Sequence, residues 1–331
     1  MRIKVLGAGS WGTALALLLY GNGHNVVLWS WDQQHVEKLL AEGENKAFLP
    51  GVSLPPDMPI TNHISGVSNA DMVVISVPSH AVHQVTEQIK DYINPNTIIV
   101  NTAKGFYSEG QLRLSEVIKR DLPNNPLVVL SGPSHAEEVA RNLPTAIVVA
   151  GDDDKILNKV QDVFMNNFFR VYTNHDVIGV EIGGAVKNII ALGVGIAEGL
   201  QIGDNAEAAL ITRGLAEITR LGEAMGAKRD TFSGLAGLGD LVVTCNSDHS
   251  RNRRAGIEIG KGRPWNQVLE DMGMVVEGVY ATENVYKLAQ RYDVEMPITE
   301  QMYALLYEGR SPQEVIWFLM TRSKTKESSE Y

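Results

Sequence analysis

The chain has 331 residues, of which 44% are hydrophobic and 21% are charged, and its formal net charge is -10. This balance is typical of a soluble globular protein with room for two domains, and the acidic charge argues against broad binding to nucleic acid or to an anionic membrane surface. Cys245 is the only cysteine, so an intrachain disulfide is excluded, and the chain starts with a strand-like run that lacks signal-peptide character. We therefore expect a cytoplasmic protein.

The first strand-like run, residues 2–6, leads into a glycine-rich turn. RIKVL is followed by GAGSWG, in which Gly7, Gly9 and Gly12 form a G-x-G-x-x-G pattern, and then by a helix-like stretch from Thr13 to Tyr20. In this context the glycines permit a tight turn, close approach of a pyrophosphate, and close packing of helix on sheet. The N–H groups at the helix start favour phosphates. We interpret the turn as a dinucleotide-binding site; the alternatives are a flavin site or a turn that only packs.

Strand-like and helix-like runs then alternate up to about Thr173. Asn25 to Trp29 completes a β-α-β unit, and Asp32 lies about 20 residues beyond the last glycine, where an acidic residue contacts the adenosine ribose. Short β-branched runs predict further strands at 71–77, 97–101, 127–130, 146–150 and 168–172. Helices are predicted at 81–92, 111–121 and 152–164. The alternation predicts a mostly parallel sheet covered on both faces, and the prolines and glycine of 49–59 predict a surface loop.

After His175 the pattern becomes entirely helical. Helices are predicted at 177–199, 207–225, around 240, and at 253–260, 264–272, 279–291, 299–308 and 312–321. The predicted fold class is therefore α/β: a Rossmann-type domain, residues 1–175, followed by an all-helical domain, 176–321, and a polar, disordered tail, 322–331. The run 177–199 is apolar on every side, which predicts a buried helix, and its glycines and polar residues argue against a membrane span.

Lys187 is the strongest catalytic candidate because it lies in the middle of that apolar helix. A lysine in such a place must pair, lose its charge or face a cavity, and burial lowers its pKa. A lysine tuned in this way can give a proton to a developing alkoxide or take one from an alcohol. The alternative is a side chain that reaches the surface past its apolar neighbours.

Two further candidates directly follow predicted strands, where open α/β sheets place their ligands. Lys104 follows the strand at 97–101, and Gly132 and Ser134 follow the strand at 127–130. For Lys104 the alternative is a solvated loop lysine. Ser134 to Glu137 also matches a capping box, so Ser134 could serve only to cap a helix.

The glycine-rich stretch 234–240 ends at Asp240, and Thr244 lies one helical turn further on. The two side chains would face the same way, and a carboxylate near two lysines would orient those lysines. The alternative is that the glycines form only a flexible bend.

Residues 250–254, SRNRR, place three arginines together in an acidic protein. We predict Ser250 as a helix N-cap and Arg251 as a phosphate ligand, and assign Arg253 and Arg254 to the surface.

Two negative predictions complete the residue-level analysis. The histidine spacing and the lone cysteine offer no metal site. Cys245 is expected to be a small buried side chain rather than a reactive thiol.

Together these motifs resemble the bacterial NAD(P)-dependent glycerol-3-phosphate dehydrogenases over nearly the whole chain. The resemblance rests on GAGSWGTALA, NTAKGF, LSGPSHAEEVA, VEIGGAVKNIIALGVGIAEGL, GDNAEAALITRGLAEI, GLAGLGDLVVTC, SRNRR and VVEGVYAT. It implies reversible reduction of dihydroxyacetone phosphate to sn-glycerol 3-phosphate, a precursor of phospholipids, with NADP or NAD as cofactor. It also implies a small phosphorylated substrate, no nucleic-acid partner, no stable membrane insertion, and a homodimer.

The resemblance further implies roles for individual residues. The catalytic group would be Lys187, Lys104, Asp240 and Thr244, with Lys187 exchanging the proton. The substrate would contact Lys104, Gly132, Ser134, Lys187, Asp240, Ser250, Arg251 and Asn252. The cofactor would contact Gly7, Gly9, Ser10, Trp11, Gly12, Trp31, Lys104, Ala136, Arg251, Val275 and Glu277.

The chain departs from this family after the second strand. Many members carry Arg or His there to meet the 2′-phosphate of NADPH, whereas this chain reads Trp29-Ser30-Trp31-Asp32. Trp31 would stack on adenine, Ser30 could bond a phosphate, and Asp32 favours a free ribose hydroxyl. We expect both cofactors to be usable. The alternative functions are a β-hydroxyacid or ketopantoate-reductase type dehydrogenase and a dinucleotide-binding protein without catalysis.

Overall fold

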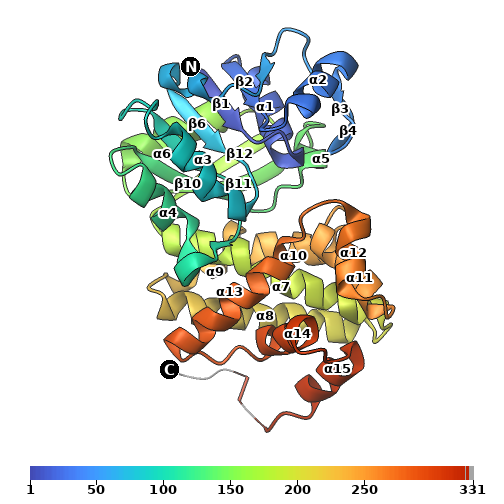
Figure 1. Cartoon of the computed structure of the whole chain (residues 1–331). Coiled ribbons are helices and arrows are strands. Elements are labelled where there is room, and N and C mark those ends of the chain that lie inside the picture. The colour runs from blue at the N-terminus through green and yellow to red at the C-terminus, as the bar shows by residue number, and fades with distance from the viewer. Residues whose placement is uncertain (325, 328–331) are drawn as a thin grey trace.

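The chain forms a sheet-containing N-terminal half and a helical C-terminal half, which lie one above the other (Figure 1). The computed structural model describes residues 1–324, 326 and 327. The predicted disordered tail, 322–331, lies partly outside the described residues; its described part contains no helix or strand.

An eight-stranded sheet forms the centre of the N-terminal half. In spatial order its strands are β12 (Phe169–Asn174), β11 (Thr145–Ala150), β10 (Leu127–Ser131), β7 (Ile98–Asn101), β6 (Met72–Ile75), β1 (Arg2–Leu6), β2 (Asn25–Trp29) and β5 (Ile60–Thr61). From β5 to β10 the pairs are all parallel and follow the Rossmann order 3-2-1-4-5-6, whereas β10 and β11 pair antiparallel. The prediction of a mostly parallel sheet is confirmed.

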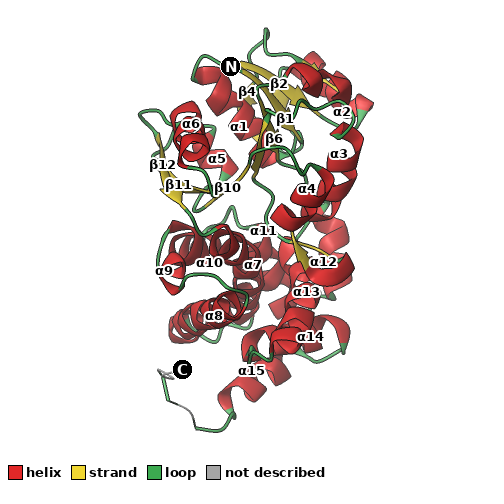
Figure 2. Cartoon of the chain, turned by 90° about the vertical axis from the view of Figure 1, so that its left-hand side faces the viewer, coloured by secondary structure: helices red, strands yellow, loops and turns green. Residues whose placement is uncertain are grey.

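Both faces of the sheet are buried, which explains why its strands read as continuous apolar runs. Ile3 and Val5 of β1 join a core with α1 (Ser10–Gly21) and α6 (Asp154–Phe164). Val73 of β6 faces the other side. It packs with α3 (Val82–Ile89) and α4 (Leu114–Asp121). Figure 2 shows these helices on opposite sides of the strands.

Short elements complete this half. They are α2 (Gln33–Glu42), α5 (Ala136–Val139), the 3₁₀ turns at Ile64–Asn69, Ser79–Ala81 and Glu109–Gln111, and the paired strands β3 (Glu44–Asn45) with β4 (Leu49–Ser53) and β8 (Phe106–Tyr107) with β9 (Leu112–Arg113). The prediction of a loop over 49–59 is therefore wrong for 49–53. Pro50 and Gly51 are tolerated there because a two-stranded ribbon leaves an open edge, and the Gly51 N–H donates to the Glu44 carboxylate at 2.7 Å.

The C-terminal half is built around α7 (Val177–Gly199). The other helices are α8 (Asp204–Ala224), α9 (Arg229–Phe232), a π-helical turn (Leu235–Gly239), α10 (Asp240–Asn246), α11 (Arg251–Gly260), α12 (Trp265–Met272), α13 (Glu277–Tyr292), α14 (Pro297–Tyr307) and α15 (Pro312–Met320). Among the described residues α7 is the one helix long and apolar enough to cross a membrane, and 89% of its apolar window is buried. It is therefore a core helix.

Glycines let α7 and α11 approach to backbone contact. A Cβ added to Gly195 would lie 2.1 Å from the Arg253 carbonyl oxygen, and one added to Gly256 would lie 2.2 Å from the Leu192 carbonyl oxygen. No side chain fits between the two helices at these points. The contact brings the start of α11, with Arg251, toward the middle of α7.

We expect Gly256→Ala to lower the free energy of unfolding by ~1–3 kcal/mol, because its methyl group would meet backbone that cannot move aside. Urea denaturation followed by circular dichroism measures this. Gly21→Ala is the matched control, since an added Cβ at this exposed helical glycine of α1 meets nothing within 4 Å. Equal stability of the two variants would contradict close packing of α7 on α11.

Candidate active site

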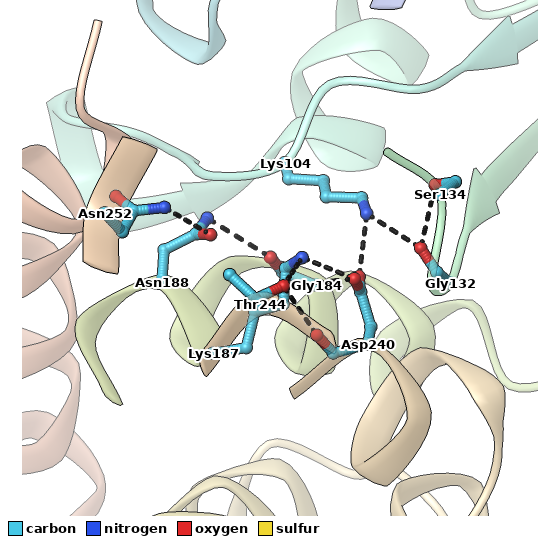
Figure 3. Close-up of polar contacts among 9 residues, drawn as sticks. All are labelled: Lys104, Gly132, Ser134, Gly184, Lys187, Asn188, Asp240, Thr244 and Asn252. Atoms are coloured by element: carbon cyan, nitrogen blue, oxygen red, sulfur yellow. Dashed lines mark hydrogen bonds and ion pairs between the residues drawn. The ribbon is translucent and has the colours of Figure 1, made fainter. Parts of the chain in front are cut away.

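The carboxyl ends of the central strands face α7 and α10, and the two halves of the chain contribute side chains to one polar group. Lys104 follows β7, and Gly132 follows β10. Lys187 projects from the middle of α7. Asp240 and Thr244 come from the start of α10. Figure 3 shows these side chains pointing toward one another.

Asp240 joins the two lysines. The Lys187 ammonium donates to Asp240 Oδ1, and the Lys104 ammonium donates to Asp240 Oδ2 at 2.7 Å. Lys104 also donates to the Gly132 carbonyl oxygen at 3.1 Å. The Asp240 side chain is only 1% exposed. One buried carboxylate therefore holds ammonium groups from both halves of the chain.

The charges in this group shift each other's pKa values. Burial lowers the pKa of Lys187 to about 8, Asp240 acts against the shift, and the neighbouring Lys104 adds to it. Burial alone would raise the pKa of Asp240, but the two lysines outweigh it and leave that pKa below its usual value. Lys187 thus has a proton affinity suited to exchange near neutral pH.

Thr244 fixes the position of the Lys187 ammonium. Its hydroxyl donates to the Asp240 carbonyl oxygen one helical turn back, at 2.6 Å, and so is free to accept from Lys187 at 2.7 Å.

The glycines before Asp240 are required for packing rather than for flexibility. A Cβ at Gly237 would lie 2.1 Å from the Phe232 carbonyl oxygen, and one at Gly183 of α7 would lie 2.4 Å from that of Ala236.

The alternative reading of Ser134, as a residue that only caps a helix, does not hold in the structure. α5 begins at Ala136, and its N-cap residue, His135, makes no side-chain cap bond. The Ser134 hydroxyl instead donates to the Gly132 carbonyl oxygen at 2.9 Å. Gly132 has φ +132°, and a Cβ there would lie 3.2 Å from Ile147 Cα. The turn therefore reverses sharply at the end of β10, and the helix starts later than the capping-box pattern indicates.

The basic cluster 250–254 divides into three environments. Ser250 is the N-cap of α11 and accepts from the Arg253 N–H at 3.2 Å, as predicted. Arg254 is exposed. The surface assignment of Arg253 is wrong, since its side chain is 15% exposed and pairs with Glu198 and Asp248 at 2.8 Å each. The cause is the close contact of α11 with α7, which places Glu198 within reach.

Arg251 differs from its neighbours because its guanidinium forms no ion pair with any described residue. Burial lowers its pKa, and the carboxylates of Glu277 and Glu137 lie near enough to act in the opposite direction. A largely buried cation without a paired anion is suited to bind one, and a guanidinium matches phosphate oxygens. Asn252, the next residue, is buried between α7 and α13 and gives both polar atoms of its amide to protein partners.

Glu277 connects the start of α13 to the sheet. It accepts from the Ser79 N–H at 3.2 Å and from the Ser79 hydroxyl at 2.8 Å, just after β6. Burial raises its pKa, and the bonds from Ser79 act against that shift. Val275 lies partly buried two residues earlier. Ser79 was not among the predicted site residues; its place directly after a strand, in the sequence Pro-Ser-His-Ala shared with 133–136, was the available signal.

The glycine-rich turn fits a dinucleotide. Gly7 has φ +116°, and a Cβ there would lie 2.5 Å from the Ser76 carbonyl oxygen, while one at Gly12 would lie 1.8 Å from the Gly7 oxygen. A Cβ at Gly9 would meet nothing within 4 Å, so this glycine opens onto free space. Gly9 caps α1 without a side-chain bond, which leaves the first helical N–H groups, including those of Ser10 and Trp11, for an anion.

The residues after β2 have partners of their own. Asp32 is the N-cap of α2 and accepts from the Gln34 N–H at 2.9 Å. The buried Ser30 hydroxyl lies 3.2 Å from His35 Nδ1. Trp31 is 81% exposed, which leaves its ring free to stack. A ribose contact by Asp32 would therefore compete with a helix cap.

Two other groups elsewhere in the chain, on α3 with α4 and on α10, carry no chemistry that we assign. His83, Glu87 and Asp121 lie together, but Asp121 already accepts from His83 at 2.8 Å and from Arg120 at 3.1 Å, and the guanidinium disfavours a metal ion. Cys245 is buried, and burial raises its pKa to about 12, so the predicted packing role is confirmed.

The fold and the site together define a two-domain dinucleotide-dependent dehydrogenase. The family model described as NAD-dependent glycerol-3-phosphate dehydrogenase N-terminus matches residues 2–157, and the corresponding C-terminus model matches 176–317. A glycerol-3-phosphate dehydrogenase (NAD(P)+) of Desulfitobacterium hafniense is 52% identical, covering 99% of this chain and 94% of the relative, and one of Thermoanaerobacter is 53% identical, covering 99% of each. A crystal structure of glycerol-3-phosphate dehydrogenase from Coxiella burnetii superposes with a TM-score of 0.94 at 43% identity, covering 97% of this chain and 99% of the other.

The chain belongs to the NAD-dependent glycerol-3-phosphate dehydrogenase family. It is an oxidoreductase, and the resemblance drawn from its motifs is confirmed. The alternative as a ketopantoate-reductase or β-hydroxyacid type enzyme is not favoured.

Proposed function

We propose that this chain reversibly reduces dihydroxyacetone phosphate to sn-glycerol 3-phosphate with NADH or NADPH, and so supplies a phospholipid precursor in the cytoplasm. The observation that carries the proposal is the pair of ammonium groups, Lys187 and Lys104, held on one buried carboxylate beside the carboxyl edge of the sheet. The glycine-rich turn of 7–12 would hold the dinucleotide, and a bound nicotinamide supplies the hydride.

The proposed roles follow from the contacts of each side chain. Lys187 gives its proton to the substrate oxygen in reduction and takes it back in oxidation, while Asp240 and Thr244 hold its ammonium in place. Lys104 orients the same oxygen from the sheet side, where Gly132 and Ser134 line the site. Arg251, with Ser250 and Asn252 beside it, holds the phosphate. Gly7, Gly9, Ser10, Trp11, Gly12, Trp31, Ala136, Val275 and Glu277 form the cofactor side.

The pKa of Lys187, about 8, predicts opposite pH dependences for the two directions. Reduction needs the charged ammonium, so kcat/KM for dihydroxyacetone phosphate falls as the pH rises through about 8. Oxidation of glycerol 3-phosphate needs the neutral amine, so its kcat/KM rises over the same range. Lys104→Met removes a cation that lowers this pKa, and both transitions move to higher pH. Parallel profiles in the two directions would exclude Lys187 as the exchanging group.

Cofactor oxidation tests the function directly. We expect turnover with dihydroxyacetone phosphate and either NADH or NADPH, because none of Ser30, Trp31 and Asp32, directly after β2, is a cation and Trp31 is exposed. Dihydroxyacetone, which lacks the phosphate, is the control substrate. Activity that does not depend on the phosphate would indicate another substrate class, and cofactor binding without any turnover would indicate a binding protein.

We also propose a homodimer and a domain boundary at 175/176. The boundary is supported by the end of β12 at Asn174 and the start of α7 at Val177. Self-association is supported by large apolar side chains on α15, where Trp317 is 61% and Met320 is 80% exposed. Sedimentation equilibrium measures the mass in solution. A monomer at micromolar concentration would contradict the proposed dimer.

A further inference from the structure

We propose that Asn188 is a positioning residue, which holds Arg251 and Glu277 in register with Lys187. The inference rests on the proposed function, because it assigns Arg251 to the phosphate and Glu277 to the cofactor side. Asn188 lies on α7 next to Lys187 and is 5% exposed.

Asn188 begins a chain of hydrogen bonds that crosses three helices. The Asn252 amide Nδ2 on α11 donates to Asn188 Oδ1 at 2.9 Å, a contact drawn in Figure 3. The Gly278 N–H at the start of α13 donates to Asn252 Oδ1 at 2.8 Å. The bonds therefore tie α7 to α11 and α11 to α13. We name this set, Asn188, Asn252 and Gly278, the amide bridge.

Each member of the amide bridge directly follows a proposed functional residue in the sequence. Asn188 follows Lys187. Asn252 follows Arg251, and Gly278 follows Glu277. A shift of any helix at the bridge must move the side chain next to it, so the two bonds fix the relative places of the proton-exchanging, phosphate and cofactor groups.

The amide bridge is tightly packed, with no room for a side chain at Gly278. A Cβ on Gly278 would lie 2.5 Å from the Asn188 carbonyl oxygen and 2.9 Å from Asn252 Oδ1. The start of α13 therefore touches α7 directly. Both Asn252 and Asn188 are buried, so water does not replace a lost partner without a rearrangement, and a buried donor left unpaired is costly. Removal of the Asn188 amide favours rotation of Asn252 and release of the Gly278 N–H.

Asn188→Ala tests the bridge through its dependence on phosphate. At saturating NADH, we expect the KM for dihydroxyacetone phosphate to rise on the order of tenfold, while kcat/KM for dihydroxyacetone stays within about twofold of wild type. The pH at which reduction falls stays near 8, since Lys187 keeps its partners. Asn284→Ala is the matched control, because Asn284 is also buried but donates only to the Tyr280 carbonyl oxygen of its own helix, at 3.0 Å.

A double-mutant cycle with Arg251→Ala separates positioning from a general structural effect. If Asn188 acts through Arg251, adding Asn188→Ala to Arg251→Ala raises the KM by less than about twofold further. Additive losses, or equal losses with dihydroxyacetone phosphate and dihydroxyacetone, would overturn the inference.

Gly278→Ala provides a second variant that leaves both asparagines in place. Its methyl group would displace the start of α13, and we expect weaker binding of NADH, measured without turnover by quenching of tryptophan fluorescence. This arm stays informative if the wild-type enzyme does not reduce dihydroxyacetone phosphate, an outcome that rejects the proposed function alone. Unchanged NADH affinity in both Asn188→Ala and Gly278→Ala would reject the bridge.

Discussion

Replacement of Lys187 by alanine should lower kcat for reduction of dihydroxyacetone phosphate by ~10²–10⁴, the range typical for loss of a general acid. The ammonium is the buried proton donor with a pKa near neutrality, and its other contacts are to Asp240 and Thr244. Steady-state kinetics at pH 7 measure the effect. NADH affinity, measured by fluorescence, should change little because the glycine-rich turn is untouched.

Lys187→Met distinguishes the contribution of proton donation from that of side-chain packing, since methionine fills much of the same volume without an ammonium group. We expect it to lose as much activity as the alanine variant but to retain more stability, because it leaves less of a cavity in α7. Turnover close to wild type in either variant at neutral pH would exclude Lys187 from the chemical step.

Asp240→Asn should damage both stability and catalysis. It removes the carboxylate shared by two lysines, and breaking a buried ion pair in this way costs ~3–5 kcal/mol. Because Asp240 raises the pKa of Lys187, that pKa falls below about 8 in the variant, and the loss of reduction at high pH moves to lower pH. We expect kcat at pH 7 to fall at least tenfold, since less of Lys187 carries a proton.

The pH dependence of unfolding supplies an independent check on Asp240→Asn. Burial already holds the folded-state pKa of Lys187 below its unfolded value, and loss of the Asp240 carboxylate lowers it further. The unfolded chain therefore binds more protons, and stability rises with pH in that interval. The matched control is Asp71→Asn, which removes an exposed pair with Arg2 and should cost less than about 1 kcal/mol. Equal losses in the two variants would contradict a buried shared carboxylate.

Most of the fold could be predicted from the sequence because the patterns that indicate its strands, helices and turns lie within short segments. Strands buried on both faces appear as continuous apolar runs, and Gly12 is required by its contact with the Gly7 backbone inside one β-α unit. The loop predicted over 49–59 is wrong for 49–53, and the alternative that Ser134 caps a helix does not hold. In both cases partners outside the local pattern decide the structure: Glu44 across a ribbon, and Gly132 in the preceding turn.

The site could be predicted one residue at a time, but its contacts could not. Lys187 and Asp240 stand out by their setting in the sequence, whereas the bond from Ser79 to Glu277 spans 198 positions and that from Asn252 to Asn188 spans 64. Nothing local in the sequence pairs such residues. The same reason explains Arg253, whose partner Glu198 comes within reach only through the glycine contact between α7 and α11.

The sharing of Asp240 between a lysine of each half has a consequence for repeated turnover. If the two halves separate to release product, Lys104 moves away with the sheet, and its positive charge no longer lowers the pKa of Lys187. Water that enters the site removes the burial, which also lowers that pKa. Opening would therefore let the neutral Lys187 amine take a proton from solvent. The enzyme would then return to its starting protonation state in the same movement that releases the product.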